Sequence, residues 1–309
     1  MESSTPAGDG LHAASAFVDA AVYQLTMMDA GLQLEFSRKG HRTECRLLEQ
    51  VPPWKVVRGF ERQEGESLVH LGNVSGGIFG GDRLRLRACL GSGAHAMLTT
   101  SGATRVYRPR DAAPEAILES EFALGRDALL EYLPDPLIPF GGARLLQRTS
   151  YALECGAALL AWDVVAPGRA ASGELFRYRQ MKLATEIRVC GRPVLQDRLL
   201  FEPDRFSPAA PAALGGYQYM VTFVALRAGA SAAEVRLLEQ ELASVAEEMQ
   251  NRGDSSGEVW AATELPAHGV LVRGLLRSSL PVPRRLQALW NTGRQRICGR
   301  TAAMPRKTY

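Results

Sequence analysis

The sequence predicts a mainly β fold: a single-domain scaffold of many short strands, antiparallel or coiled like a β-helix, with two or more α-helices. Apolar and polar residues alternate over most of the chain, and helical spacing is confined to two late segments, near 231–252 and 283–298. No linker rich in Pro, Gly or Ser divides residues 16–300, which indicates one domain. A chain of 309 residues, of which 46% are hydrophobic, is long enough to bury a sizeable core.

The first strands are expected to form a hairpin. "GLQLEF" places Leu32, Leu34 and Phe36 on one face, "HRTECRLL" continues the alternation, and Lys39-Gly40 lies between the two runs. "DRLRLRACL" then alternates leucines with arginines, as a strand with one solvent-exposed face would. Further alternating runs are "AILESEFAL", "RDALLEYL", "RLLQRTSYAL", "ALLAWDVV", "LFRYRQMKL", "TEIRVCGRPVLQDRLLF" and "YQYMVTFVAL".

Two segments have helical spacing and recognisable ends. Ser231 and Glu234 form a capping box, and an apolar stripe follows them. The stripe consists of Val235, Leu238, Leu242, Val245 and Met249. The second helix is expected to start near Pro283 and to end before Gly299, because proline favours the first turn and glycine the position after the end.

Charge is distributed unevenly although the formal net charge is only +3. After Glu264 the chain has no further acidic residue, but it has nine basic ones. They are Arg273, Arg277, Arg284, Arg285, Arg294, Arg296, Arg300, Arg306 and Lys307. A basic end favours an acidic partner or a nucleic acid, but a solvated basic helix with a frayed tail explains it equally well. We expect residues 1–15, which are small and polar, to be disordered, and 301–309 to form a basic tail.

Several classes of protein are disfavoured. The N-terminus has no basic region before Arg38, and no apolar stretch is long enough to span a membrane, so we expect a soluble, cytoplasmic protein without a membrane partner. The five cysteines and five histidines are isolated, which argues against a disulfide framework or a local zinc or nickel centre. The chain lacks a G-x-S-x-G elbow and the interleaved aromatic and basic residues of RNA-binding modules.

The glycine cluster "GGIFGGDRL" contains Gly76, Gly77, Gly80 and Gly81. A P-loop needs a lysine and a Ser or Thr after its last glycine, but here Asp82 and an arginine follow, and a dinucleotide fingerprint needs a following helix. A tight structural turn is the favoured interpretation. The alternative is a small-anion or nucleotide site formed by this turn with Arg105 and Arg108.

Three acidic residues stand in unusual surroundings. Asp135 lies between two prolines in "LPDPLIP", where a rigid extended loop could recognise a partner. Asp163 in "LLAWDVV" and Asp197 in "VLQDRLLF" interrupt apolar strands. A carboxylate in such a strand needs a partner or water, and for Asp163 an internal salt bridge with an arginine is the simplest explanation.

Taken together, five segments resemble the family of urease accessory proteins called UreD, or UreH in some bacteria. They are "GGIFGGDRL", "TTSGATRVYR", "EYLPDPLIPFGGAR", "LLAWDVVAPGRAASGELF" and the terminal Pro305-Arg306, in family order between residues 25 and 306. The resemblance implies a β scaffold with two or more helices and no catalysis of its own. It also implies a chaperone that binds the urease apoprotein and a UreF-type protein, which recruits a UreG-type GTPase.

In this family nickel is thought to pass through a water-filled tunnel to the nascent urease centre, so the implied metal is transient and no cofactor is tightly bound. Carried over by position, Asp82, Asp163 and Asp197 would line that path. Scattered carboxylates suit such a task, because they bind nickel more weakly than a His or Cys cage does. For docking we expect Asp135 and four residues of the basic C-terminal helix to contribute, namely Arg284, Arg285, Trp290 and Arg294.

Overall fold

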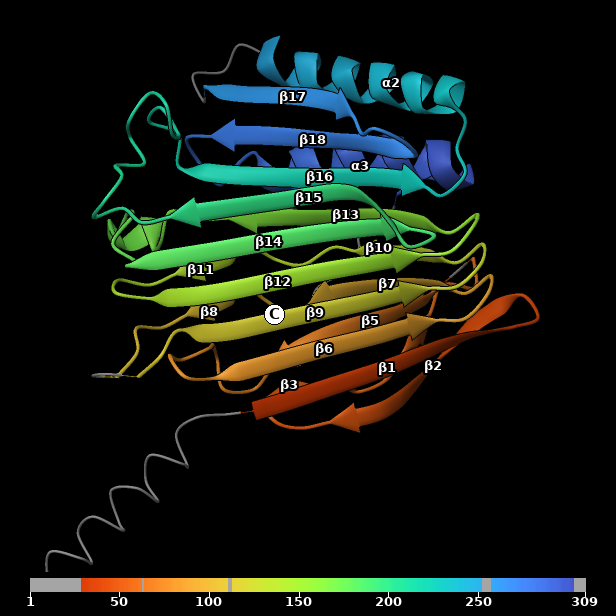
Figure 1. The fold of residues 1–309 in the computed structure, drawn as a ribbon, viewed down its shortest axis with the longest axis horizontal. Helices are drawn as coiled ribbons and strands as arrows, with labels where there is room; N and C mark the ends of the chain where they lie inside the picture. Colours follow the sequence, from red (N-terminus) through yellow and green to blue (C-terminus); the bar gives the residue numbers. More distant parts are fainter. Residues whose placement is uncertain (1–28, 63, 111–112, 252–256, 303–309) are drawn as a thin grey trace, which may run out of the picture.

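The computed structural model describes residues 29–62, 64–110, 113–251 and 257–302 (Figure 1). The segment 1–15 and residues 303–309 of the basic tail lie outside this part of the chain. The strands are β1 (Asp29–Lys39), β2 (Arg42–Gln50), β3 (Trp54–Lys55), β4 (Phe60–Glu61), β5 (Ser67–Asn73), β6 (Arg83–Leu90), β7 (His95–Thr100), β8 (Thr104–Val106), β9 (Ala116–Leu124), β10 (Leu129–Tyr132), β11 (Leu137–Pro139), β12 (Arg144–Leu153), β13 (Ala158–Val165), β14 (Gln180–Val189), β15 (Arg192–Phe201), β16 (Tyr219–Arg227), β17 (Glu258–Glu264) and β18 (Gly269–Leu276). The helices are α2 (Ala232–Asn251) and α3 (Val282–Cys298), and a short 3₁₀ helix, η1, spans Ala170–Ser172.

The strands form two large sheets that face each other. One sheet has seven strands in the order β15-β14-β12-β9-β6-β1-β2. The other has eleven strands, and its main path runs β17-β18-β16-β13-β10-β7-β5-β3. The predicted mainly β class is therefore confirmed.

The centre of the molecule is a coil in which the chain passes back and forth between the two sheets. β5, β7, β10 and β13 pair in parallel in the eleven-stranded sheet. β6, β9, β12 and β14 pair in parallel in the other sheet. Each turn of the coil returns in the same direction, so its strands are parallel; the antiparallel pairs lie toward the sheet edges (Figure 1). Of the two arrangements expected from the sequence, the β-helical one describes the centre.

The predicted hairpin is confirmed at one edge. β1 and β2 pair antiparallel, with Lys39 opposite Arg42, and Gly40 in the turn has a φ of +60°. Glycine suits this position because it tolerates positive φ without a steric penalty.

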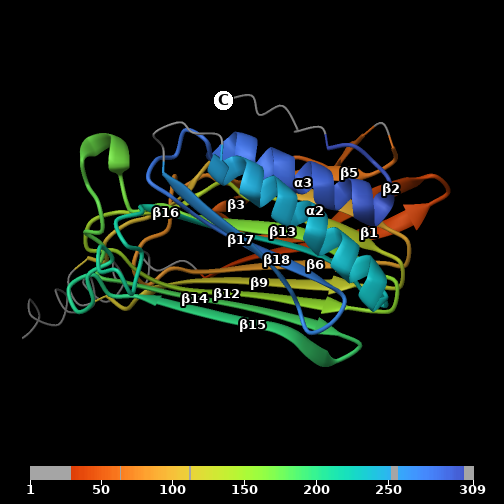
Figure 2. The same ribbon diagram turned by 90° about the horizontal axis from the view of Figure 1, so that it is seen from above.

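Two apolar layers result from this arrangement. One lies between the sheets, and the other lies between the eleven-stranded sheet and the helices. Figure 2 shows α2 and α3 on the outer face of the eleven-stranded sheet, whereas no helix of the described residues covers the outer face of β12, β14 and β15. Both faces of the central strands of the eleven-stranded sheet are therefore buried, which decides where several polar side chains lie.

Both helices match the sequence prediction. Ser231 accepts a hydrogen bond from the Glu234 backbone N–H, and the Glu234 carboxylate accepts one from Ser231 N–H, as expected for a capping box. Helix α3 ends at Gly299, which has a left-handed φ of 68°. Neither helix in the described part of the chain combines the length and apolar character needed to cross a bilayer.

Candidate functional site

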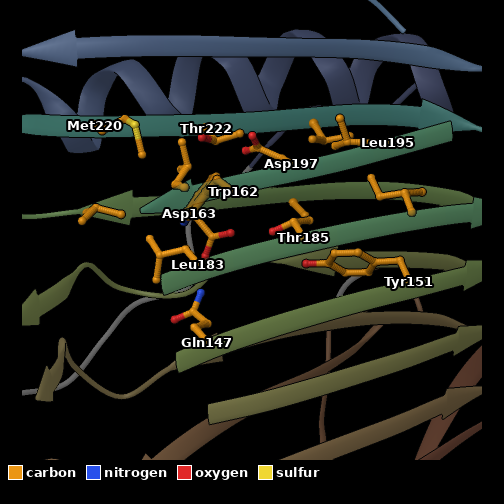
Figure 3. A pocket seen from close by; sticks show the side chains of 15 residues that line it. Gln147, Tyr151, Trp162, Asp163, Leu183, Thr185, Leu195, Asp197, Met220 and Thr222 are labelled. Atoms are coloured by element: carbon orange, nitrogen blue, oxygen red, sulfur yellow. The ribbon is translucent and has the colours of Figure 1, made fainter. Parts of the chain in front are cut away.

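Asp163 and Asp197 project from different sheets and line the same cavity (Figure 3). Asp163 comes from β13 of the eleven-stranded sheet and Asp197 from β15 of the seven-stranded sheet. The cavity has a volume of about 30 Å³, which is room for about one water molecule. The other lining residues are Gln147, Tyr151, Ala161, Trp162, Val165, Leu183, Thr185, Ile187, Leu195, Leu199, Met220, Thr222 and Val224. The fold thus joins two carboxyl groups that the sequence singled out separately.

Asp163 titrates far from the usual range of a carboxyl group. Its pKa is raised to about 7, chiefly because burial penalises the charged form. The negative charge of Asp197 acts in the same direction, and a hydrogen bond with the Gln147 side chain opposes both effects. A cation that approached this carboxyl would favour its ionised form, so cation uptake would be coupled to proton release.

Asp197 forms an ion pair at the rim of the cavity. Arg273 Nη2 on β18 lies 2.5 Å from Asp197 Oδ2, and the two side chains are 30% and 21% exposed. Asp163, Thr222 and Arg273 are successive cross-strand partners on β13, β16 and β18. The internal salt bridge with an arginine that the sequence suggested for Asp163 is thus found at Asp197 instead. In the described residues no ion pair is found for Asp163.

The seven-stranded sheet carries a row of polar side chains that ends at Asp197. Ser120, Thr149, Thr185 and Asp197 are successive cross-strand partners on β9, β12, β14 and β15. Ser120 and Thr149 are buried, each with 4% of its surface exposed. The row therefore runs through the interior of the molecule.

A second, larger cavity lies at the other end of this row. Its volume is about 220 Å³, and Ser120 and Tyr132, which hydrogen bond to each other, both line it. Arg105 and the glycine turn, through Gly76 and Gly77, also contribute to the lining. Hydroxyl groups thus connect the larger cavity to the one that holds the two aspartates. Within the described ranges, no three His, Cys, Asp or Glu side chains gather to hold a metal ion.

Comparison with known proteins decides the family. A family model described as "UreD urease accessory protein" matches residues 28–309. The chain belongs to the UreD family. Among curated relatives, urease accessory protein UreD of Herpetosiphon aurantiacus is 37% identical over 93% of this chain and 98% of its own length. The UreD protein of Pseudomonas putida (strain GB-1) is 32% identical over 90% of this chain and 92% of its own length. That of Klebsiella aerogenes is 33% identical over 65% of this chain and 79% of its own length.

The UreD-like segments that fall within the described residues meet at one end of the coil, while Pro305-Arg306 lies outside that part of the chain. Ile78 of the glycine turn bridges to Val106, and its backbone N–H donates to Arg105 O at 2.8 Å. Phe140 N–H donates to Val106 O at 2.8 Å, and β11 pairs with both β8 and β13. Segments that are far apart in the sequence thus form one continuous backbone network beside the larger cavity.

Asp82 has a different place from the other two aspartates. Its side chain is fully buried, and Phe79 N–H donates to Asp82 Oδ2 at 2.9 Å, which closes the glycine turn. Asp82 lies outside the linings of both cavities. Asp82 therefore lies apart from Asp163 and Asp197, and its carboxylate faces the turn that it stabilises, so a role in the path stays a prediction.

Close packing explains the glycines of this turn. A Cβ on Gly77 would lie 2.3 Å from the Tyr107 ring, and one on Gly80 would lie 2.2 Å from Pro109. Gly76 and Gly81 have positive φ values of 78° and 91°. Tyr107 and Pro109 thus fill the space on one side of the turn, which supports the structural interpretation. On the other side Gly76, Gly77 and Arg105 line the larger cavity, so the small-anion alternative stays a prediction.

Asp135 lies next to the larger cavity. Its backbone N–H donates to Thr100 Oγ1 at 2.8 Å, and Thr100 is one of the lining residues. The Asp135 side chain is half-buried and accepts a longer hydrogen bond, 3.3 Å, from the same hydroxyl. The proline-rich loop thus helps to form one wall of the site.

Two of the four helix residues expected at a partner interface are buried. Trp290 Nε1 donates to Glu131 Oε2 at 2.5 Å, and Arg294 Nη2 lies 3.0 Å from Glu66 Oε1. His95 Nε2 lies 2.6 Å from Glu131 Oε1. The exposed fractions of Trp290 and Arg294 are 0% and 2%, so these side chains anchor α3 to the sheet and do not form a surface here.

The other two helix residues lie nearer the solvent. Arg285 pairs with Glu258 at 3.0 Å, and Arg284 is exposed. Arg284 is therefore the one of the four that remains available for docking without a change in packing. The sequence analysis did not single out Arg273 as a site residue. Its signal was nevertheless present, because Arg273 interrupts the apolar run "VLVRGLL" as Asp163 interrupts "LLAWDVV".

Proposed function

We propose that this chain is a non-catalytic scaffold of urease maturation that gives nickel an interior route to the urease active site. In this proposal it binds the urease apoprotein together with UreF-type and UreG-type accessory proteins. Membership of the UreD family supports a role in urease maturation. The observation that carries the route is the convergence of Asp163 and Asp197 on one cavity between the sheets.

The chemistry of the two aspartates suits a cargo that must be released. Carboxylate oxygens bind Ni²⁺ more weakly than imidazole or thiolate groups do, so they can hold the ion without trapping it. An anionic, hydrated surrounding also lowers the cost of moving a divalent ion through a protein interior. Because the pKa of Asp163 is about 7, this carboxyl can exchange a proton for a cation near neutral pH.

The proposed route connects the two cavities along the row of hydroxyl groups. It begins at the larger cavity and continues past Ser120, Thr149 and Thr185 to Asp197. A cavity of about 30 Å³ cannot hold an ion with its hydration shell, so passage requires side chains to move. Arg273, which pairs with Asp197 at the rim, is the side chain whose movement would free a carboxylate.

The route can be tested with isosteric substitutions. Asp163→Asn, Asp197→Asn and the double variant are co-produced with urease and the accessory proteins, and the nickel content of purified urease is measured. We expect the double variant to remain folded and in the complex but to give urease with severalfold less nickel. Asp204→Asn, at an exposed position in the loop after β15, is the matched control. Urease with a full complement of nickel in the presence of the double variant would rule out the route.

A further inference from the structure

We propose that the loop end of the coil is a docking surface for a protein partner with an acidic surface. The surface, here called the arginine–aromatic patch, lies beside the glycine turn and the larger cavity. It consists of the exposed arginines Arg105, Arg108, Arg169 and Arg177 and the half-buried rings of Phe79, Tyr107 and Phe140.

The three rings form a continuous cluster. Phe79 and Tyr107 stack with their ring centres 4.7 Å apart, and Tyr107 contacts Phe140 edge to face, also at 4.7 Å. The guanidinium of Arg169 lies over the Phe140 ring, 4.8 Å from its centre. The apolar part of the patch is therefore ordered before any partner arrives, which lowers the entropic cost of docking.

The arginines are contiguous with this cluster. Gly142 N–H donates to Arg177 O at 2.8 Å, and a Cβ on Gly142 would lie 3.3 Å from Arg108 Cβ. Arg105 O accepts from Ile78 N–H, and this carbonyl lies against Gly77 in the turn. All four arginines thus border one stretch of surface.

Positive charge on this patch is largely uncompensated. Glu174 pairs with Arg169 and also interacts electrostatically with Arg177, whereas Arg105 and Arg108 have no ion-pair partner among the described residues. The outer face of the seven-stranded sheet differs, since Arg87 pairs with Glu121 at 2.9 Å and Arg148 with Glu119 at 3.1 Å. Arg87 and Arg148 are thus compensated by neighbouring carboxylates, whereas two of the four arginines of the patch are not.

The geometry of the rings favours a protein over a nucleic acid. Single strands bind by stacking bases on open aromatic faces. Here Phe79 and Tyr107 cover each other, and Arg169 covers a face of Phe140. Arginine and half-buried aromatic residues are the composition enriched in protein interfaces, and acidic side chains on the partner would complement the patch.

The position of the patch suggests what docking achieves, and this step rests on the proposed nickel route. Arg105 lines the larger cavity as well as the patch, so a partner seated here covers the cavity opening. The four arginines repel a free divalent cation from that opening. An acidic partner would neutralise them, so the cation would enter from the partner and not from bulk solvent.

Charge reversal tests the proposal directly. The double variant Arg105→Glu/Arg108→Glu and the neutral Arg105→Gln/Arg108→Gln are compared with Arg192→Glu/Arg198→Glu, which alters two exposed arginines without ion-pair partners among the described residues. Dissociation constants are measured for the purified UreF-type protein, the urease apoprotein and a single-stranded oligonucleotide, at several salt concentrations. Circular dichroism confirms that each variant is folded.

We expect the Glu variant to bind one of the two proteins at least about tenfold more weakly, with a reduced salt dependence, and the Gln variant to lie between it and wild type. The Arg192/Arg198 control should bind as wild type does. Unchanged binding of both proteins to the Glu variant overturns the inference and leaves the proposed function intact. Loss of oligonucleotide binding alone overturns it in favour of a nucleic acid. If the wild type binds neither protein, the proposed function fails, and this docking partner fails with it.

Discussion

Asp197 raises the pKa of Asp163 across the space between two sheets, so the charge of one carboxylate acts on the titration of a carboxyl in the opposite sheet. Replacing Asp197 by Asn removes a negative charge and leaves the positive charge of Arg273 without its partner. Both effects favour the ionised form of Asp163. We therefore predict a lower pKa for Asp163 in Asp197→Asn. Carboxyl ¹³C NMR titration measures it, and an unchanged pKa would show that the two groups do not interact.

The raised pKa of Asp163 also predicts how stability depends on pH. The folded state holds the Asp163 proton up to about pH 7, whereas the unfolded chain releases it near pH 4, so the folded state binds more protons between these values. This residue therefore makes the protein less stable as pH rises from about 4 to 7, by about 4 kcal/mol at most. Urea unfolding should show a flatter pH profile over that window for Asp163→Asn than for wild type. Parallel profiles for the two proteins would contradict the assignment.

The buried ionic cluster under α3 predicts a large difference between two arginines of one helix. Arg294→Met leaves Glu66 and Glu131 buried without their shared cation, which should cost about 3–5 kcal/mol of unfolding free energy. Arg284→Met, on the exposed face, should change it by less than about 0.5 kcal/mol. Chemical denaturation of both variants provides the comparison. Equal stabilities would mean that Arg294 is not buried in solution.

The glycine turn offers a test of packing with an internal control. Gly80→Ala places a Cβ 2.2 Å from Pro109 Cβ and 2.9 Å from Pro114 O, and we expect a loss of about 1–3 kcal/mol in unfolding free energy. Gly102→Ala meets no atom within 4 Å and should be close to neutral. Thermal unfolding distinguishes the two. A tolerated Gly80→Ala would indicate that the turn is looser than described.

Local patterns in the sequence predicted most elements of the fold correctly. The alternation around Lys39 and Gly40 predicted a hairpin, and Ser231 with Glu234 predicted the start of a helix, because both signals act over a few residues. The parallel coil was one of two expected arrangements. Alternation alone cannot decide between them, since it reports the faces of a strand and not the direction of its neighbours.

The composition of the site depends on contacts that no local pattern encodes. Asp163 and Asp197 meet because turns of the coil place β13 opposite β15, and the lengths of several loops set that register. Glu131 interrupts the apolar run "ALLEYL", and the helices cover its face of the sheet and bury it. For the same reason Trp290 and Arg294 looked available in the sequence and are not.

The central claim is that nickel travels inside this chain. The most direct measurement is nickel transfer to urease apoprotein from a purified complex of this protein with UreF-type and nickel-loaded UreG-type proteins, in the presence of excess EDTA. We predict that urease acquires nickel nearly as well as it does without the chelator, because the ion is sheltered, and that Asp163→Asn/Asp197→Asn reduces the transfer. Complete capture of the nickel by EDTA with the wild-type complex would contradict the claim.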